Sequence, residues 1–179
     1  MINTKRYGNI GEAMAVSLFV KHGIPIALPF GDNEKYDLIA EFNGKLNKIQ
    51  IKTSISKTEN GTVIFDVTSS SSHRKNGCKT KYTRKDIDYF FCYNIEIDKA
   101  FLIEAPEEPM AAITIRIDPP KNTYAKNIRY EKDYLFENVI KSFTDNGMYD
   151  NLAVRLVWDQ DVVRSNRIIP VWCLKVWCG

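Results

Sequence analysis

The sequence predicts an α/β fold in which a mixed β-sheet is flanked by helices. Apolar residues recur at helical spacing over Gly8–Lys21 and again over Glu131–Phe143. Between these segments, runs rich in β-branched and aromatic residues are separated by turn signals at Asn43-Gly44 and Asp98-Lys99. Strands bounded by amphipathic helices are typical of a sheet whose faces are covered by helices.

The first helix is expected to pass through Gly8–Lys21 and to end at Gly23, a common position for a left-handed cap. Each glycine inside a helix costs about 1 kcal/mol relative to alanine. Gly8 and Gly11 both lie within one turn of Glu12. We therefore expect the helix backbone to approach another element closely near Glu12.

A short edge strand is predicted over Ile24–Phe30, because its two prolines cannot donate ladder hydrogen bonds. Tyr36–Phe42 and Leu46–Ser54 then read as the two strands of a hairpin. A two-residue turn at Asn43-Gly44 pairs residues whose numbers sum to about 87, so Asp37 is expected opposite Gln50.

Side chains alternate between the two faces of a strand. Gln50 and Lys52 therefore share one face of the second hairpin strand, and Ile49 and Ile51 share the other. Lys52 is expected to emerge on the same face as the Asp37–Gln50 pair.

Further strands are expected over Thr62–Thr68, as the third strand of a meander, and over Tyr89–Ile97, Ala100–Ile103 and Ala112–Ile117. We divide the chain into a core, residues 1–105, and a C-terminal extension, residues 106–179. The extension holds a strand, a helix and an apolar tail that we expect to pack on the core or in an oligomer interface. All three tryptophans (Trp158, Trp172 and Trp177) lie in it.

The composition, 44% hydrophobic and 26% charged, is ordinary for a protein with a buried core. No apolar run approaches the roughly 20 residues that span a bilayer, and the first residues are polar, so we expect a cytoplasmic protein of bacterial or organellar origin. The cysteines lack a Cys-x-x-Cys pair and are expected to be free thiols. They are Cys78, Cys92, Cys173 and Cys178.

Positive charge is concentrated between residues 69 and 85, although the whole chain carries only +3. This segment is predicted to be a loop that contacts DNA phosphates, because clustered cations attract polyanions. The alternative is a solvated loop with no ligand. The six predicted contacts are Arg74, Lys75, Lys79, Lys81, Arg84 and Lys85.

Glu12, Asp37, Gln50 and Lys52 are the candidate catalytic residues. Magnesium prefers hard oxygen ligands and needs only one or two carboxylates from the protein. Asp37, Glu12, the Gln50 side-chain oxygen and the Ile51 carbonyl are the expected metal ligands. An ammonium at Lys52 is suited to hold a scissile phosphate and to orient or deprotonate a water. The set indicates phosphodiester cleavage, although each residue alone is more often structural.

The order of these motifs resembles the PD-(D/E)XK nuclease superfamily, and more narrowly its small homing endonucleases encoded in group I introns. The matching motifs are Gly8-x-x-Gly11-Glu12, Tyr36-Asp37-Leu38-Ile39, Gln50-Ile51-Lys52 and Asp88-Tyr89-Phe90. The resemblance covers about residues 4–105. It implies a restriction-endonuclease-like core and a site of Glu12, Asp37, Gln50 and Lys52. In that family the acid of the (D/E)XK motif is often glutamine, as at Gln50 here. The sequence departs from the usual Pro-Asp at Tyr36, and Gln50 supplies one negative charge fewer than an acid would.

The same resemblance implies Mg²⁺ dependence, with Mn²⁺ as a substitute, and cleavage of double-stranded DNA by a homo-oligomer, a dimer or tetramer. Three alternatives stay open at this point. The first is a Holliday junction resolvase on the same core, and the second is a catalytically inactive DNA-binding module. The third is an RNA-processing nuclease, because a fold does not fix its substrate.

Overall fold

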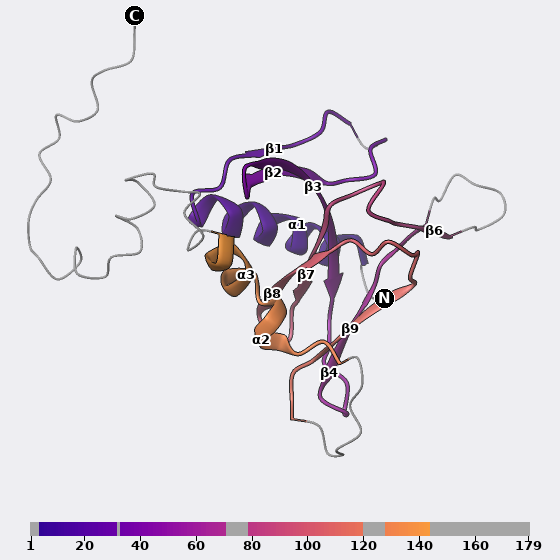
Figure 1. Cartoon of the computed structure of the whole chain (residues 1–179). Coiled ribbons are helices and arrows are strands. Elements are labelled where there is room, and N and C mark those ends of the chain that lie inside the picture. Colours follow the sequence, from indigo (N-terminus) through magenta and orange to yellow (C-terminus); the bar gives the residue numbers. More distant parts are fainter. Residues whose placement is uncertain (1–3, 32, 71–78, 120–127, 144–179) are drawn as a thin grey trace, which may run out of the picture. The chain divides into compact units, whose positions relative to one another are not determined.

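The computed structural model describes residues 4–31, 33–70, 79–119 and 128–143 (Figure 1). A five-stranded sheet forms its centre, in the order β1-β2-β3-β7-β8. Strands β3 and β7 are parallel and the other neighbours are antiparallel, so the predicted mixed sheet is confirmed. The strands are β1 (Ile26–Ala27), β2 (Leu38–Phe42), β3 (Lys45–Ser54), β7 (Tyr89–Asn94) and β8 (Lys99–Glu104).

The β2–β3 hairpin has the predicted register. Its turn residues both have positive φ, 53° at Asn43 and 64° at Gly44, as a two-residue turn of the primed type requires. Leu38 pairs with Ile49 at the far end of the ladder. Asn47, which is 5% exposed, donates through Nδ2 to the carbonyls of Phe42 and Lys45, both at 3.0 Å. This buried side chain closes the turn from inside.

Strand β7 is aligned with β3 by Asp88. The Asp88 carboxylate accepts a hydrogen bond from the Lys48 amide at 2.8 Å, and the Asp88 amide donates to the Lys48 carbonyl at 2.9 Å. The parallel ladder begins one residue later, with Ile49 opposite Tyr89. A single residue pair therefore sets the register between two strands that are about 40 positions apart in the chain.

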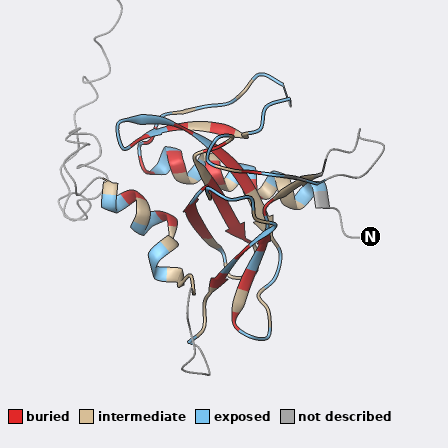
Figure 2. Cartoon of the chain, turned by 45° about the vertical axis from the view of Figure 1, so that its right-hand side comes forward, coloured by how far each residue is buried: buried red, intermediate tan, exposed pale blue. Residues whose placement is uncertain are grey.

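Helix α1 (Thr4–Lys21) packs against β3 and β7 on one face of the sheet. Phe19 is fully buried, with its ring centroid 5.9 Å from that of Phe91 and 5.0 Å from that of Phe136. Figure 2 shows buried residues along the central strands and on one side of α1. The aromatic contacts join the first helix, the sheet and the last helix.

On the opposite face, a two-stranded sheet of β4 (Thr62–Asp66) and β9 (Ala112–Arg116) covers the residues Phe90 and Cys92. The prediction that Thr62–Thr68 continues the meander is wrong, because β4 pairs with β9. The strand also ends early. The Asp66 carboxylate accepts hydrogen bonds from the amide and the hydroxyl of Thr68, at 2.9 and 2.5 Å, and this local turn interrupts the ladder.

After this turn, β5 (Thr68–Ser70) pairs with β6 (Lys79–Lys81) as a small antiparallel ribbon. The sequence did not predict β6. Residues 71–78, which connect the two strands and include Arg74 and Lys75, lie outside the described residues.

The helix predicted over Glu131–Phe143 is two helices, α2 (Glu131–Tyr134) and α3 (Phe136–Phe143). Leu135 interrupts them because its backbone is extended, with φ −51° and ψ 132°, and it bridges to Phe101 on β8. Phe136 and Ile140 of α3 are buried.

The tail after residue 143, with the three tryptophans, lies outside the described residues, as do Cys78, Cys173 and Cys178. Cys92 is a buried free thiol, and burial raises its pKa. In the part of the chain that the structure describes, no helix is both long and apolar enough to cross a membrane.

Gly11 is the point where α1 touches β3. A Cβ at this position would lie 1.9 Å from Thr53 Oγ1 and 3.5 Å from Ile51 Cγ2, whereas a Cβ at Gly8 would meet open space. The expected close approach near Glu12 is therefore confirmed at Gly11 and wrong at Gly8.

We predict opposite effects for two alanine substitutions in α1. Gly11→Ala should lower the free energy of unfolding by about 1–3 kcal/mol, because the added methyl overlaps Thr53. Gly8→Ala should raise it by up to about 1 kcal/mol through helix propensity. Urea unfolding measures both, and Thr53→Ala should recover part of the Gly11→Ala loss. Equal effects of the two substitutions would contradict the packing argument.

Candidate active site

Asp37 is attached to β3 by its carboxylate. Its Oδ2 atom accepts hydrogen bonds from Gln50 Nε2 at 2.5 Å and from the Ile51 amide at 2.6 Å. The Asp37 amide donates to the Ile49 carbonyl at 2.8 Å, which extends the hairpin pairing by one residue. The expected meeting of Asp37 and Gln50 across the hairpin is thus present as a direct contact.

The Ile51 backbone faces the side of β3 on which Asp37 lies. In an antiparallel pair, the N–H and C=O of one residue point to the same neighbour. The β2 ladder starts only at the Leu38–Ile49 pair, so the Ile51 carbonyl lies beyond the paired part of β2. Gln50 Nε2 is 3.5 Å from this carbonyl oxygen. The Asp37 carboxylate, the Gln50 amide and the Ile51 carbonyl are therefore grouped at the end of β2.

Lys52 occupies the face of β3 opposite α1, beside Cys92 in the parallel register. Its ammonium donates to the Thr68 carbonyl at 2.9 Å and lies 5.1 Å from the centroid of the Tyr82 ring. Burial lowers the Lys52 pKa, and the negative charge of Asp37 partly opposes this change. A half-buried ammonium with a weakened preference for its proton is suited to proton transfer as well as to phosphate binding.

Glu12 approaches from the other side. It is exposed on α1 and lines a recess of about 190 Å³, whose wall also includes Ile51, Lys52 and Thr53. Among the described residues no hydrogen bond joins Glu12 to Asp37, but the charge of Glu12 raises the Asp37 pKa. Glu12 therefore acts on the same site across a gap.

Burial is the largest cause of the raised Asp37 pKa, and Glu12 adds to it. The hydrogen bonds from Ile51 and Gln50 and the charge of Lys52 work in the opposite direction without cancelling the rise. A buried carboxylate beside a second carboxylate is a common arrangement where a cation binds.

The oxygen donors of this group fit a hard divalent cation. Asp37 and Glu12 supply carboxylates, Ile51 a backbone carbonyl and Gln50 an amide oxygen if its side chain turns. The described residues contain no cluster of three or more His, Cys, Asp or Glu side chains. A site here would thus hold its metal with only two charged ligands and with water.

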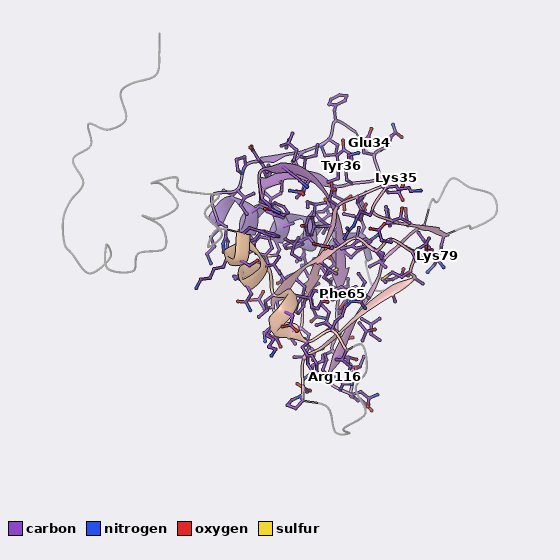
Figure 3. The ribbon with its side chains drawn as sticks, viewed as in Figure 1. Glu34, Lys35, Tyr36, Phe65, Lys79 and Arg116 are labelled. Atoms are coloured by element: carbon purple, nitrogen blue, oxygen red, sulfur yellow. The ribbon has the colours of Figure 1, made fainter. Side chains whose placement is uncertain are left out.

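Four of the six predicted DNA contacts fall in the described residues, two of them in ion pairs. Lys79 pairs with Asp66 at 2.8 Å, and Arg84 pairs with Glu104 at 2.6 Å. Both are largely exposed pairs, which contribute about 0–1 kcal/mol and are easily exchanged. Figure 3 shows Lys79 at the periphery of the described residues, well apart from Arg116. Lys81 and Lys85 are also exposed.

Sequence reasoning did not find Thr68 or Tyr82 as neighbours of Lys52. A backbone carbonyl leaves no sequence signal, so Thr68 could not have been found. Tyr82 did stand out as the one aromatic residue among the six clustered cations. Nothing in the sequence of that segment, however, links its ring to Lys52.

A family model described as PD-(D/E)XK endonuclease matches residues 2–137. The chain belongs to the PD-(D/E)XK endonuclease family. Endonucleases of this family act on DNA and generally use divalent metal ions. Both the predicted family and the predicted α/β core are confirmed.

Among solved structures, this PD-(D/E)XK endonuclease is similar to a bacterial homing endonuclease, I-Ssp6803I. The TM-score is 0.63 at 21% sequence identity, and the match covers 84% of this chain and 99% of the other. This likeness shows a shared fold. No curated protein matches the sequence.

We predict that Asp37→Asn stabilises this metal-free PD-(D/E)XK endonuclease at neutral pH. The pKa of Asp37 is raised in the folded state. The wild-type protein therefore loses folding stability as the pH rises from 3.8, the ordinary pKa, through the folded-state pKa. Asparagine carries no such charge and can still accept from the Ile51 amide. Thermal unfolding in a chelator should show a higher Tm for the variant at pH 7, and the difference should shrink toward pH 3.

Asp66→Asn is the control of opposite sign. The hydrogen bond from Lys79 lowers the Asp66 pKa to about 2. The ionised Asp66 therefore stabilises the folded protein at neutral pH, and this stabilisation is lost as the pH falls through its folded-state pKa. This variant should be less stable than the wild type at pH 7. A lower Tm for Asp37→Asn at pH 7 would contradict the electrostatic argument.

Proposed function

We propose that this chain is a metal-dependent endonuclease that hydrolyses double-stranded DNA at the site formed by Asp37, Gln50, Ile51 and Lys52, with Glu12 beside it. The contact of Asp37 Oδ2 with both Gln50 and the Ile51 amide carries the proposal. Through this contact a carboxylate, an amide and a carbonyl lie together one residue before the half-buried Lys52.

Asp37, Glu12 and the Ile51 carbonyl would hold Mg²⁺, and Mn²⁺ would substitute for it because both accept oxygen ligands. Bound metal would supply charge neutralisation at the phosphate and a more acidic water. Gln50 now donates to Asp37 through Nε2. Rotation of its amide would present the oxygen in place of the nitrogen.

Lys52 would bind a non-bridging oxygen of the scissile phosphate through its ammonium. This interaction strengthens as negative charge develops on the phosphate in the transition state. The lowered Lys52 pKa also allows it to orient or accept a proton from the attacking water. Its contact with the Thr68 carbonyl is a single hydrogen bond that a phosphate oxygen can replace.

A homing role and a homo-oligomeric assembly, a dimer or tetramer, belong to the same proposal. The likeness to a bacterial homing endonuclease supports the first, since the match spans 99% of that chain. Cleavage of both DNA strands by one site per subunit favours more than one subunit. The basic segment, residues 69–85, is the proposed DNA-contacting loop.

We predict that Asp37→Ala and Lys52→Ala each reduce the rate of plasmid cleavage with Mg²⁺ by about 10²–10³-fold, because each removes a group that acts in the transition state. Lys45→Ala is the matched control, since Lys45 is an exposed lysine on the same strand. Retention of DNA binding by the two inactive variants would separate chemistry from binding. Cleavage at the wild-type rate by both would overturn the site assignment.

A second prediction concerns Lys81 on β6. Lys81→Ala should reduce the slope of log affinity for double-stranded DNA against log salt by about 0.9, the value for one phosphate contact. Lys132→Ala on α2 removes an exposed lysine outside the proposed loop and should leave the slope unchanged. Fluorescence anisotropy over a range of KCl concentrations measures both slopes. Equal slopes for all three proteins would contradict a DNA contact at Lys81.

Selection of cleaved sites from a random double-stranded DNA library with Mg²⁺ tests the function as a whole. Recovery of one long shared sequence is the expected result. Cleavage of four-way junctions without sequence preference would favour a resolvase. Metal-independent binding with no cleavage of any substrate would favour an inactive binding module.

A further inference from the structure

The ammonium of Lys52 contacts groups that lie outside the β2–β3 hairpin, the element to which Lys52 itself belongs. Thr68, whose carbonyl accepts its hydrogen bond at 2.9 Å, is the first residue of β5. Tyr82, whose ring centroid lies 5.1 Å from Nζ, directly follows β6. Both contacts therefore come from the base of the β5–β6 ribbon.

Tyr82 is fixed more firmly than an ordinary loop residue. It is 5% exposed and belongs to the core cluster that includes Phe90. The two rings meet edge to face, with centroids 5.9 Å apart and an interplanar angle of 87°. The Tyr82 side chain is also hydrogen-bonded to that of Ser69, which is paired with Thr80 in the ribbon. The ring therefore has little freedom to move away from Lys52.

A half-buried ammonium needs partners that replace the water it has lost. The face of an aromatic ring is electronegative and attracts a cation without forming a fixed hydrogen bond. A carboxylate in the same place would neutralise the ammonium and repel a phosphate. An aromatic ring holds the ammonium in position and leaves the N–H groups of the ammonium free to donate to substrate.

On the condition that Lys52 acts in catalysis as proposed above, we propose that Tyr82 is a positioning residue, whose ring face holds the Lys52 ammonium toward the scissile phosphate. The Tyr82 hydroxyl is not part of this role. The contact should contribute about tenfold to the rate of the chemical step, the scale of a partly desolvated cation–π pair. It should contribute little to DNA affinity.

Fluorinated phenylalanines at position 82 provide a test that a packing role would not pass. Successive fluorines withdraw electron density from the ring face with little change of shape. Phenylalanine and its mono-, di- and trifluoro derivatives would be introduced at residue 82 of the full chain. The single-turnover rate would be measured with Mg²⁺ on a plasmid carrying a site recovered from the library, together with its Kd.

We expect Tyr82→Phe to cleave at close to the wild-type rate. The rate should then fall stepwise with each fluorine, to about one tenth for the trifluoro derivative, while Kd stays constant. Phe65→Leu is the control for core disruption, because Phe65 is fully buried in the same cluster and contacts Phe101. It should lower thermal stability and leave the rate unchanged below its Tm.

A rate that does not depend on fluorination would overturn the role of Tyr82, provided that the wild type cleaves and Lys52→Ala does not. A large loss in Tyr82→Phe alone would assign the effect to the hydroxyl and would overturn it as well. If Lys52→Ala cleaves like the wild type, the proposed function of Lys52 fails, and the role of Tyr82 is overturned with it.

Discussion

The hydrogen bond from the Ile51 amide to the Asp37 carboxylate is the contact on which the candidate site depends. It forms just before β2 begins at Leu38, so an acidic side chain takes the place of the backbone partner that an earlier residue would supply if β2 were longer. The same carboxylate atom also binds the Gln50 amide. One oxygen thus stops the ladder, fixes the direction of Asp37 and groups the oxygen donors. Burial of this carboxylate raises the pKa of Asp37, and the hydrogen bonds from Ile51 and Gln50 oppose that rise.

Three separate parts of the fold supply the charged groups of the site. The hairpin holds Asp37, the ribbon base holds the ammonium of Lys52, and α1 brings Glu12 along the other face through the close contact at Gly11. Asp37 and Lys52 influence each other by charge, since each works against the pKa shift that burial causes in the other. Each charge therefore helps to keep the other ionised in a site where burial favours both neutral forms.

The sequence was informative where structure depends on neighbouring residues. The Asn43-Gly44 turn fixed the hairpin register, and strand alternation placed Lys52 opposite the α1 face. Prediction from the sequence failed where residues distant in the chain determine the local structure. Nothing local in Thr62–Thr68 indicates pairing with β9, and nothing at Leu135 predicts a bridge to Phe101.

The position of the two groups that hold Lys52 has a consequence for the evolution and redesign of DNA specificity. Thr68 and Tyr82 flank the ribbon, and the connection between β5 and β6 lies between them in the chain. If the basic segment contacts DNA as proposed, insertions, deletions or grafts within that connection would change DNA contacts without altering either flanking residue. Target choice can then diverge quickly among relatives without loss of the chemical step. A substitution of Tyr82, by contrast, would alter every target alike, whereas Thr68 contacts Lys52 through a backbone carbonyl that any residue supplies.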